Sequence, residues 1–103
     1  MRNHGDPLSE IDPVIHAPAR LRLIAQLYVV DAADATFLVN STSLTWGNLA
    51  THLRKLEDNG YVTVNKGYRG RKPNTSISLT KSGRTAFQKY RTTIRAALDR
   101  LPE

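Results

Sequence analysis

Two groups of polar residues in the second half of this chain have the types and spacing needed to bind a nucleic acid. Residues 46–58 read as a helix whose exposed face, at roughly 100° per residue, carries amide, hydroxyl and cationic side chains. Residues 66–74 follow with four cations and no Asp or Glu. The first kind of side chain reads base edges and the second kind binds phosphates. The chemistry that we expect is therefore recognition of a polyanion, with duplex DNA as the first candidate.

We expect every predicted contact residue to be exposed, either on this helix or on the basic tip. Gly47 would let the helix backbone approach its target closely. In the tip, Gly67, Gly70 and Pro73 predict an exposed loop, too long for a two-residue turn, that presents its cations outward. The alternative is that these are ordinary solvated residues. The predicted DNA contacts are Thr45, Gly47, Asn48, Thr51, Arg54, Lys55, Lys66, Arg69, Arg71 and Lys72.

Basic charge is segregated along the chain, whose net charge is +6. No Asp or Glu occurs between residues 59 and 98, a stretch that contains nine Lys and Arg residues. Residues 1–43 instead carry three Arg residues against five acidic ones, so we do not expect that half to face phosphate. This asymmetry favours a polyanion-binding surface over a basic face that serves only solubility.

Helix and strand signals place both groups on a small α+β fold within one domain of 103 residues. Thr45 is a good N-cap and Gly60 a good stop, so the helix between them is well bounded. Alternating residues on either side of the basic tip predict a two-stranded hairpin. We expect a short arm, helices over residues 18–30, 36–40, 46–58 and 81–101, and strands over residues 61–65 and 76–80.

Apolar spacing predicts the core faces of these elements. On the third helix, Leu49, Leu53 and Leu56 share one side, with Trp46 alongside, and this side should pack on the first two helices. In the hairpin, strand alternation predicts a second core face. That face comprises Val62, Val64, Ile77 and Leu79.

The last predicted helix carries an apolar stripe with nearly heptad spacing, in which positions 87, 94 and 101 recur, as do 90 and 97. We expect a two-fold dimer seam here; the alternative is packing on the protomer's own helices. We therefore divide the chain into an arm (1–16), a DNA-binding core (17–80) and a dimerisation helix (81–103). The predicted dimer contacts are Leu8, Ile11, Phe87, Tyr90, Ile94, Leu98 and Leu101.

Catalysis, cofactors and metals are not expected. The chain has no cysteine, and His4, His16 and His52 have no nucleophile, carboxylate pair or ligand spacing nearby in the sequence. We expect His52, at the edge of a buried helix face, to be structural. No apolar run suggests a signal peptide or a membrane span, so we expect a cytoplasmic protein with no membrane partner. Whether a small-molecule effector binds stays open.

Taken together, these segments resemble the winged helix-turn-helix transcriptional regulators, specifically the small MarR-like group of stand-alone DNA-binding proteins. The resemblance is carried by HAPARLRLI at residues 16–24, LTWGNLATHLRKLE at 44–57 with GYV at 60–62, and GRKPNT at 70–75 followed by LTKSGR at 79–84. Trp46 departs from the small or acidic residue expected there, which leaves its role open between packing and phosphate contact.

The resemblance implies a three-helix core, a two-stranded β wing and a C-terminal dimerisation helix. It also implies a homodimer on double-stranded DNA, with the face over residues 45–55 in the major groove and the region of Arg71 on the backbone or minor groove. Two such helices about 34 Å apart would read a pseudo-palindromic operator. The alternatives are a non-specific nucleoid-associated or RNA-binding protein, or a winged-helix module for protein interactions.

Overall fold

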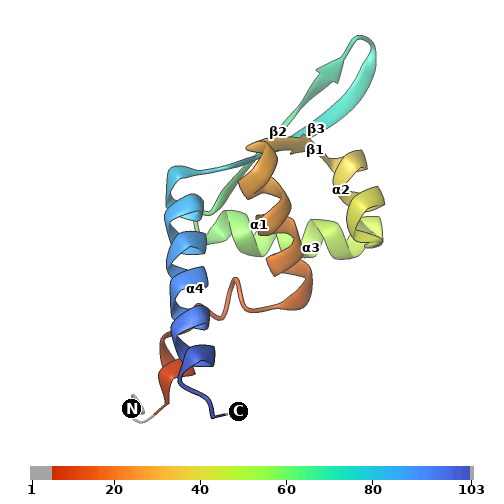
Figure 1. Ribbon diagram of the computed structural model, residues 1–103. Coiled ribbons are helices and arrows are strands. Elements are labelled where there is room, and N and C mark those ends of the chain that lie inside the picture. Colours follow the sequence, from red (N-terminus) through yellow and green to blue (C-terminus); the bar gives the residue numbers. More distant parts are fainter. Residues whose placement is uncertain (1–5, 103) are drawn as a thin grey trace.

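The computed structural model describes residues 6–102 and arranges them as helices around a small antiparallel sheet (Figure 1). The body is elongated, with extents of 55 × 25 × 23 Å, because a β-hairpin and the last helix project from it in opposite directions. In chain order the elements are η1 (Pro7–Glu10, a 3-10 helix), α1 (Pro18–Val30), β1 (Ala32–Asp34), α2 (Ala35–Thr42), α3 (Trp46–Asp58), β2 (Val62–Arg69), β3 (Lys72–Leu79) and α4 (Lys81–Asp99).

Local capping signals explain where the helices begin and end. Thr45 Oγ1 accepts a hydrogen bond from the backbone N–H of Asn48 at 3.1 Å, which starts α3 where the sequence predicted. Asp34 and Thr80 cap α2 and α4 in the same way. At the other end of α3, Gly60 has a φ of 76°, as its predicted role in stopping the helix requires. The helix α2 is longer than the predicted residues 36–40, because the Asp34 cap starts it one residue earlier and it continues two residues further, to Thr42.

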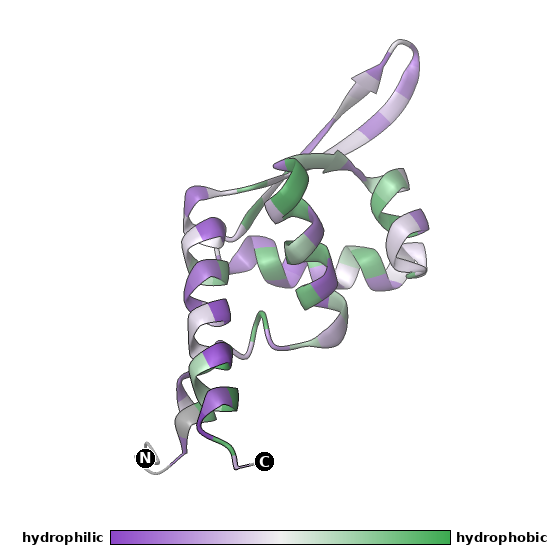
Figure 2. Ribbon diagram, in the orientation of Figure 1, coloured by the Kyte–Doolittle hydropathy of each residue, from purple (hydrophilic) through white to green (hydrophobic). Residues whose placement is uncertain are grey.

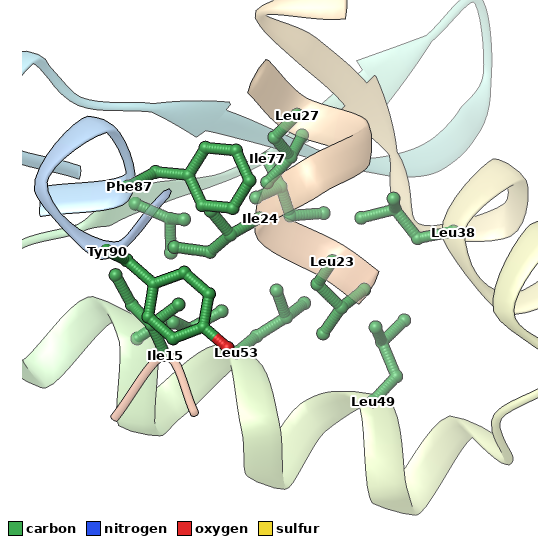
Figure 3. Close-up of a cluster of buried hydrophobic side chains, with 12 residues drawn as sticks. Ile15, Leu23, Ile24, Leu27, Leu38, Leu49, Leu53, Ile77, Phe87 and Tyr90 are labelled. Carbon is green, nitrogen blue, oxygen red and sulfur yellow. The ribbon is translucent and has the colours of Figure 1, made fainter. Parts of the chain in front are cut away.

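The core lies where α1 crosses α3 (Figure 3). The predicted leucines of α3, at positions 49, 53 and 56, are buried against α1. In the hairpin, Val62 pairs with Leu79 and Val64 pairs with Ile77, which confirms the predicted core face. Hydrophobic residues gather on α1 and the elements around it, whereas the projecting hairpin is hydrophilic or neutral along most of its length (Figure 2).

The sheet has three strands in the order β1-β3-β2, not the two that the sequence predicted. No strand was expected over residues 31–34, which lie between the first two predicted helices. Asp31 ends α1 with a φ of 68°, and the next three residues pair with Ser76, Ile77 and Ser78 of β3. A strand of three residues is too short to show an alternating pattern.

The predicted loop over residues 66–74 is wrong. We call the whole β2–β3 hairpin (residues 62–79) the wing. Residues 66–74 form its outer half, where Arg69 pairs directly with Lys72. Only Gly70 and Arg71 form the turn, where Gly70 has the positive φ, 62°, that the first central position of a type II′ turn needs. Pro73 is tolerated because β1 pairs no further than Ser76, so β3 is an edge strand there.

The predicted arm is also partly wrong, because residues 11–15 belong to the core. Ile15 is fully buried, and Ile11 and Val14 pack against the same cluster. The first half of the predicted dimer stripe on α4 likewise packs on its own protomer, where the Phe87 and Tyr90 rings stack 6.3 Å apart. Ile94 is half-buried at the edge of this cluster. Leu98 and Leu101 remain 56% and 61% exposed.

Trp46 lies alongside the leucines of α3 as expected, about 60° from Leu49 at 100° per residue, and lines the same hollow as Leu49 and Leu53. It does not share their burial, because its side chain is 56% exposed. The tryptophan therefore lies over a hollow between α3 and the wing.

Candidate nucleic-acid interface

All ten predicted contact residues are exposed, and they lie on two neighbouring surfaces, the outer face of α3 and the wing. Six of them belong to α3 or its cap: Gly47, Asn48, Thr51, Arg54 and Lys55 lie away from the buried leucines of α3, and Thr45 is its N-cap. The other four are on the outer wing, where Arg69 and Lys72 face each other across the hairpin and Arg71 occupies the turn. The tertiary structure thus presents one convex helix face beside one basic projection.

The side chains on the α3 face differ in how free they are. Thr45 Oγ1 is occupied as the cap of α3, and Thr51 Oγ1 donates to the Gly47 carbonyl at 3.0 Å. Thr51 therefore offers a methyl group and acceptor lone pairs, not a donor. Within residues 6–102, the side chains of Asn48 and Lys55 have no hydrogen-bond or ion-pair partner. Asn48 can both donate and accept, which is what recognition of a base edge requires.

The cations of the wing are nearly all unpaired. Among the described residues, Lys66, Arg71 and Lys72 have no acidic partner. Arg69 is the exception, since its guanidinium lies 3.7 Å from a carboxylate oxygen of Asp34. Tyr68 is 77% exposed and lies on the same face of β2 as Lys66. The wing is therefore a concentrated positive charge with little internal compensation.

Asp34 connects the wing to the start of α2. One of its carboxylate oxygens accepts from the Phe37 N–H at 2.8 Å as the cap of α2, and the other faces Arg69. The sequence analysis missed this residue because it lies between two predicted helices, although Asp three residues before Phe37 is an N-cap signal.

A hollow of about 260 Å³ separates α3 from the wing. Its floor is apolar, formed by Leu49, Leu53 and Val64, and its sides carry Trp46, Arg54, Glu57, Lys66 and Thr75. We call it the α3–wing hollow. Sequence reasoning did not find it, because it depends on how a helix and a hairpin are placed relative to each other.

The described histidines have structural surroundings. Arg20 donates to His52 Nδ1 over 3.2 Å and to the Val14 carbonyl over 2.6 Å, which ties α1 to α3. His16 Nδ1 lies 2.9 Å from the Tyr90 hydroxyl. His4 lies outside the described residues.

Two further properties can be stated for residues 6–102. No group of three or more His, Cys, Asp or Glu side chains is arranged to hold a metal ion. No helix in this range has the length and apolar character needed to cross a bilayer.

The match to known proteins covers most of the chain. A family model described as a winged helix DNA-binding domain matches residues 19–98. The chain is 34% identical over 77 residues to an uncharacterised protein of Methanocaldococcus jannaschii, covering 75% of this chain and 84% of the relative.

Solved structures share the fold as well. A transcriptional regulator homologue from Pyrococcus horikoshii OT3 superposes with a TM-score of 0.79 at 29% identity, covering 84% of this chain and 85% of that one. A MarR family transcriptional regulator from Silicibacter pomeroyi superposes with a TM-score of 0.65 at 21% identity, covering 93% of this chain and 64% of that one. The protein therefore belongs to the winged helix DNA-binding domain family and is a DNA-binding transcriptional regulator, not an enzyme.

Proposed function

We propose that the protein regulates transcription as a homodimer that binds a pseudo-palindromic operator sequence-specifically. In each protomer α3 lies in the major groove, and the wing contacts the minor groove or the flanking backbone. The observation that carries the proposal is the outer face of α3, where the Asn48 and Lys55 side chains have no partner among residues 6–102, beside a wing without acidic residues.

Each surface has a distinct task in this proposal. On α3, the Asn48 amide suits the edge of an adenine, and the Thr51 methyl group suits a thymine methyl. On the wing, Arg69, Arg71 and Lys72 supply charge that binds phosphate whatever the sequence, and Arg71 at the tip suits a narrow minor groove. Specificity therefore comes from α3, and most of the salt-dependent affinity comes from the wing.

The dimer is supported by apolar residues at the opposite end of the molecule. Leu8, Leu98 and Leu101 are exposed where η1 lies beside the end of α4 (Figure 1). A surface hollow of about 310 Å³ lined by Ile94 and Leu98 adjoins them. We call this region the α4–η1 end. A two-fold contact there would cover these side chains and leave both copies of α3 exposed.

A regulator of this kind acts where the chromosome is, so we assign it to the cytoplasm.

The test measures fluorescence anisotropy of the purified protein with the duplex upstream of its own coding region and with a scrambled duplex, each at two salt concentrations. We expect a preference of about a thousandfold for the upstream duplex. The log of the binding constant should fall by about 0.9 per log unit of salt for each neutralised phosphate. Equal binding to both duplexes would indicate a non-specific nucleoid or RNA-binding protein. Binding that does not depend on salt would favour a protein-interaction module, and so would the absence of any DNA binding.

Asn48→Ala tests the reading role of α3 directly. We expect a loss of about 1 to 3 kcal/mol on the preferred duplex and little change on the scrambled one, because only the base contact is removed. Asn40→Ala is the matched control, since Asn40 is an exposed asparagine on the neighbouring helix α2. An equal loss on both duplexes would contradict base reading by Asn48.

A further inference from the structure

Trp46 is an exposed aromatic side chain that the DNA contacts proposed so far do not use. It lies at the first position of α3, 56% exposed, at the edge of the α3–wing hollow. Within residues 6–102 the indole N–H has no hydrogen-bond partner. We propose that the α3–wing hollow seats one sugar–phosphate strand of the DNA and that Trp46 contacts this strand. This inference rests on the proposed binding of duplex DNA.

The positions of α3 and the wing determine where the DNA backbone must pass. In a duplex the major and minor grooves are adjacent, and one sugar–phosphate backbone separates them. A protein that puts α3 in one groove and the wing in the other must therefore let that backbone pass between α3 and the wing. Here α3 and the β2–β3 hairpin frame such a passage, and the hollow of about 260 Å³ lies between them, with Ala35 at the start of α2 also in its lining.

The lining of the hollow has the chemistry of a sugar–phosphate chain. Arg54 on the α3 side and Lys66 on the wing side are exposed cations without acidic partners in the described chain. They flank a floor of leucine and valine side chains, which suits the C–H groups of deoxyribose. Glu57 also lines the hollow, near the C-terminal end of α3 and away from Trp46. We therefore place the phosphates nearer to the N-terminal half of α3, which also carries the positive end of the helix dipole.

Trp46 can make two contacts with such a strand. The ring face packs against a deoxyribose, and Nε1–H donates a hydrogen bond to a phosphate oxygen. Both contacts are made to the backbone, so they position the helix without reading sequence. This resolves the departure noted in the sequence: a large aromatic residue at the start of α3 is exposed because its partner is the DNA strand.

The chain contains a single tryptophan, so intrinsic tryptophan fluorescence reports on position 46 alone. We would measure acrylamide quenching of the full-length protein, free and saturated with the duplex that anisotropy shows to bind. We expect the quenching constant to fall severalfold in the complex because the strand covers the indole. If saturation is confirmed by anisotropy but quenching is unchanged, the inference is wrong and the proposed function stands. If no duplex binds, both are wrong.

Variants separate the two contacts. Trp46→Ala should weaken binding by about tenfold on the preferred and scrambled duplexes alike, the size expected for losing a hydrogen bond to a charged group. Trp46→Phe keeps the ring and should recover part of that loss. Neither should change the salt slope, since no charge is removed, whereas Lys66→Ala should reduce it by about 1. Val29→Ala, at an 80% exposed apolar residue on α1, is the control. A loss confined to the preferred duplex would mean a base contact and would overturn the inference.

Discussion

The wing and the α4–η1 end both project from the helical body, but in opposite directions (Figure 1), and only the second exposes large aliphatic side chains. The outer wing is exposed on both faces and carries Lys66, Arg69, Arg71 and Lys72. The α4–η1 end exposes leucines instead. A cationic projection is stable in water alone, whereas clustered exposed leucines favour an apolar partner. The two ends are therefore suited to different partners, a polyanion and a second copy of the chain.

This difference has an energetic signature. Burying a leucine contributes about 1.5 to 3 kcal/mol and depends little on salt. Phosphate contacts by the wing release counterions, so their contribution falls steeply as salt rises. Raising the salt concentration should therefore release the DNA while the dimer remains, and the following substitutions test each end separately.

The largest effect should come from the α4–η1 end. Leu98→Glu combined with Leu101→Glu places charges of one sign on both sides of a two-fold contact, so we expect sedimentation to show a monomer. Because the two half-sites would no longer be bound by one particle, DNA affinity should fall by at least about a hundredfold. Val29→Glu, which changes an exposed apolar residue of α1, is the control. A double variant that still sediments as a dimer would place the dimer contact elsewhere.

The wing should give the next largest effect. Arg71→Ala with Lys72→Ala removes two exposed cations from the tip, so binding should weaken by about tenfold or more on every sequence and the salt slope should fall by about 2. The dimer should be unaffected. Lys81→Ala with Lys89→Ala removes the same charge from exposed positions on α4 and is the control. Unchanged DNA affinity in the wing variant, measured by anisotropy, would refute the role given to the wing.

Asp34 sharpens the comparison because, among the described residues, it is the one acid within ion-pair distance of a wing cation. Asp34→Asn keeps an N-cap for α2 but frees Arg69 for phosphate, so affinity should rise, by no more than about fivefold for an exposed ion pair. The control is Asp31→Asn, whose partner Arg84 lies on α4. In an Arg69→Ala background the gain should vanish. A gain that persists there would mean that Asp34 simply repels DNA.

The parts of the interface that could be predicted from sequence depend on local signals. The bounds and faces of α3 follow from the Thr45 cap, the Gly60 stop and the leucine spacing, all within one helix. The cations of the wing were also found, because their charge is visible in the sequence whatever their conformation.

The parts that were missed depend on contacts between distant segments. Backbone pairing between β2 and β3 holds the outer wing, and its side chains are exposed to solvent on both faces. Hydropathy therefore does not alternate along these residues. Ile15 becomes core only through the cluster that it joins with residues of α1, α3 and α4. The α3–wing hollow and the exposure of Trp46 likewise follow from the angle between helix and hairpin, which no residue spacing encodes.

The smallest effect that we predict is on stability at high pH, and it comes from a contact in the helical body next to the α4–η1 end. The Tyr61 hydroxyl donates to a carboxylate oxygen of Asp12, which ties the segment before α1 to the start of the hairpin. Partial burial, together with this hydrogen bond and the charge of Asp12, raises the pKa of Tyr61 to about 12. An unfolded tyrosine ionises near pH 10.

The contribution of Tyr61 to stability should therefore be complete below about pH 10 and lost as the pH rises from about 10 to about 12, because only the unfolded chain releases the proton in that range. Tyr61→Phe cannot ionise and should lose less stability between about pH 9 and about pH 11 in urea unfolding. The difference should be modest because Tyr61 is only half-buried. Tyr68→Phe, at the exposed wing, should behave like the unmodified protein. Parallel pH profiles for Tyr61→Phe and the unmodified chain would show that the Tyr61–Asp12 contact does not hold this end together.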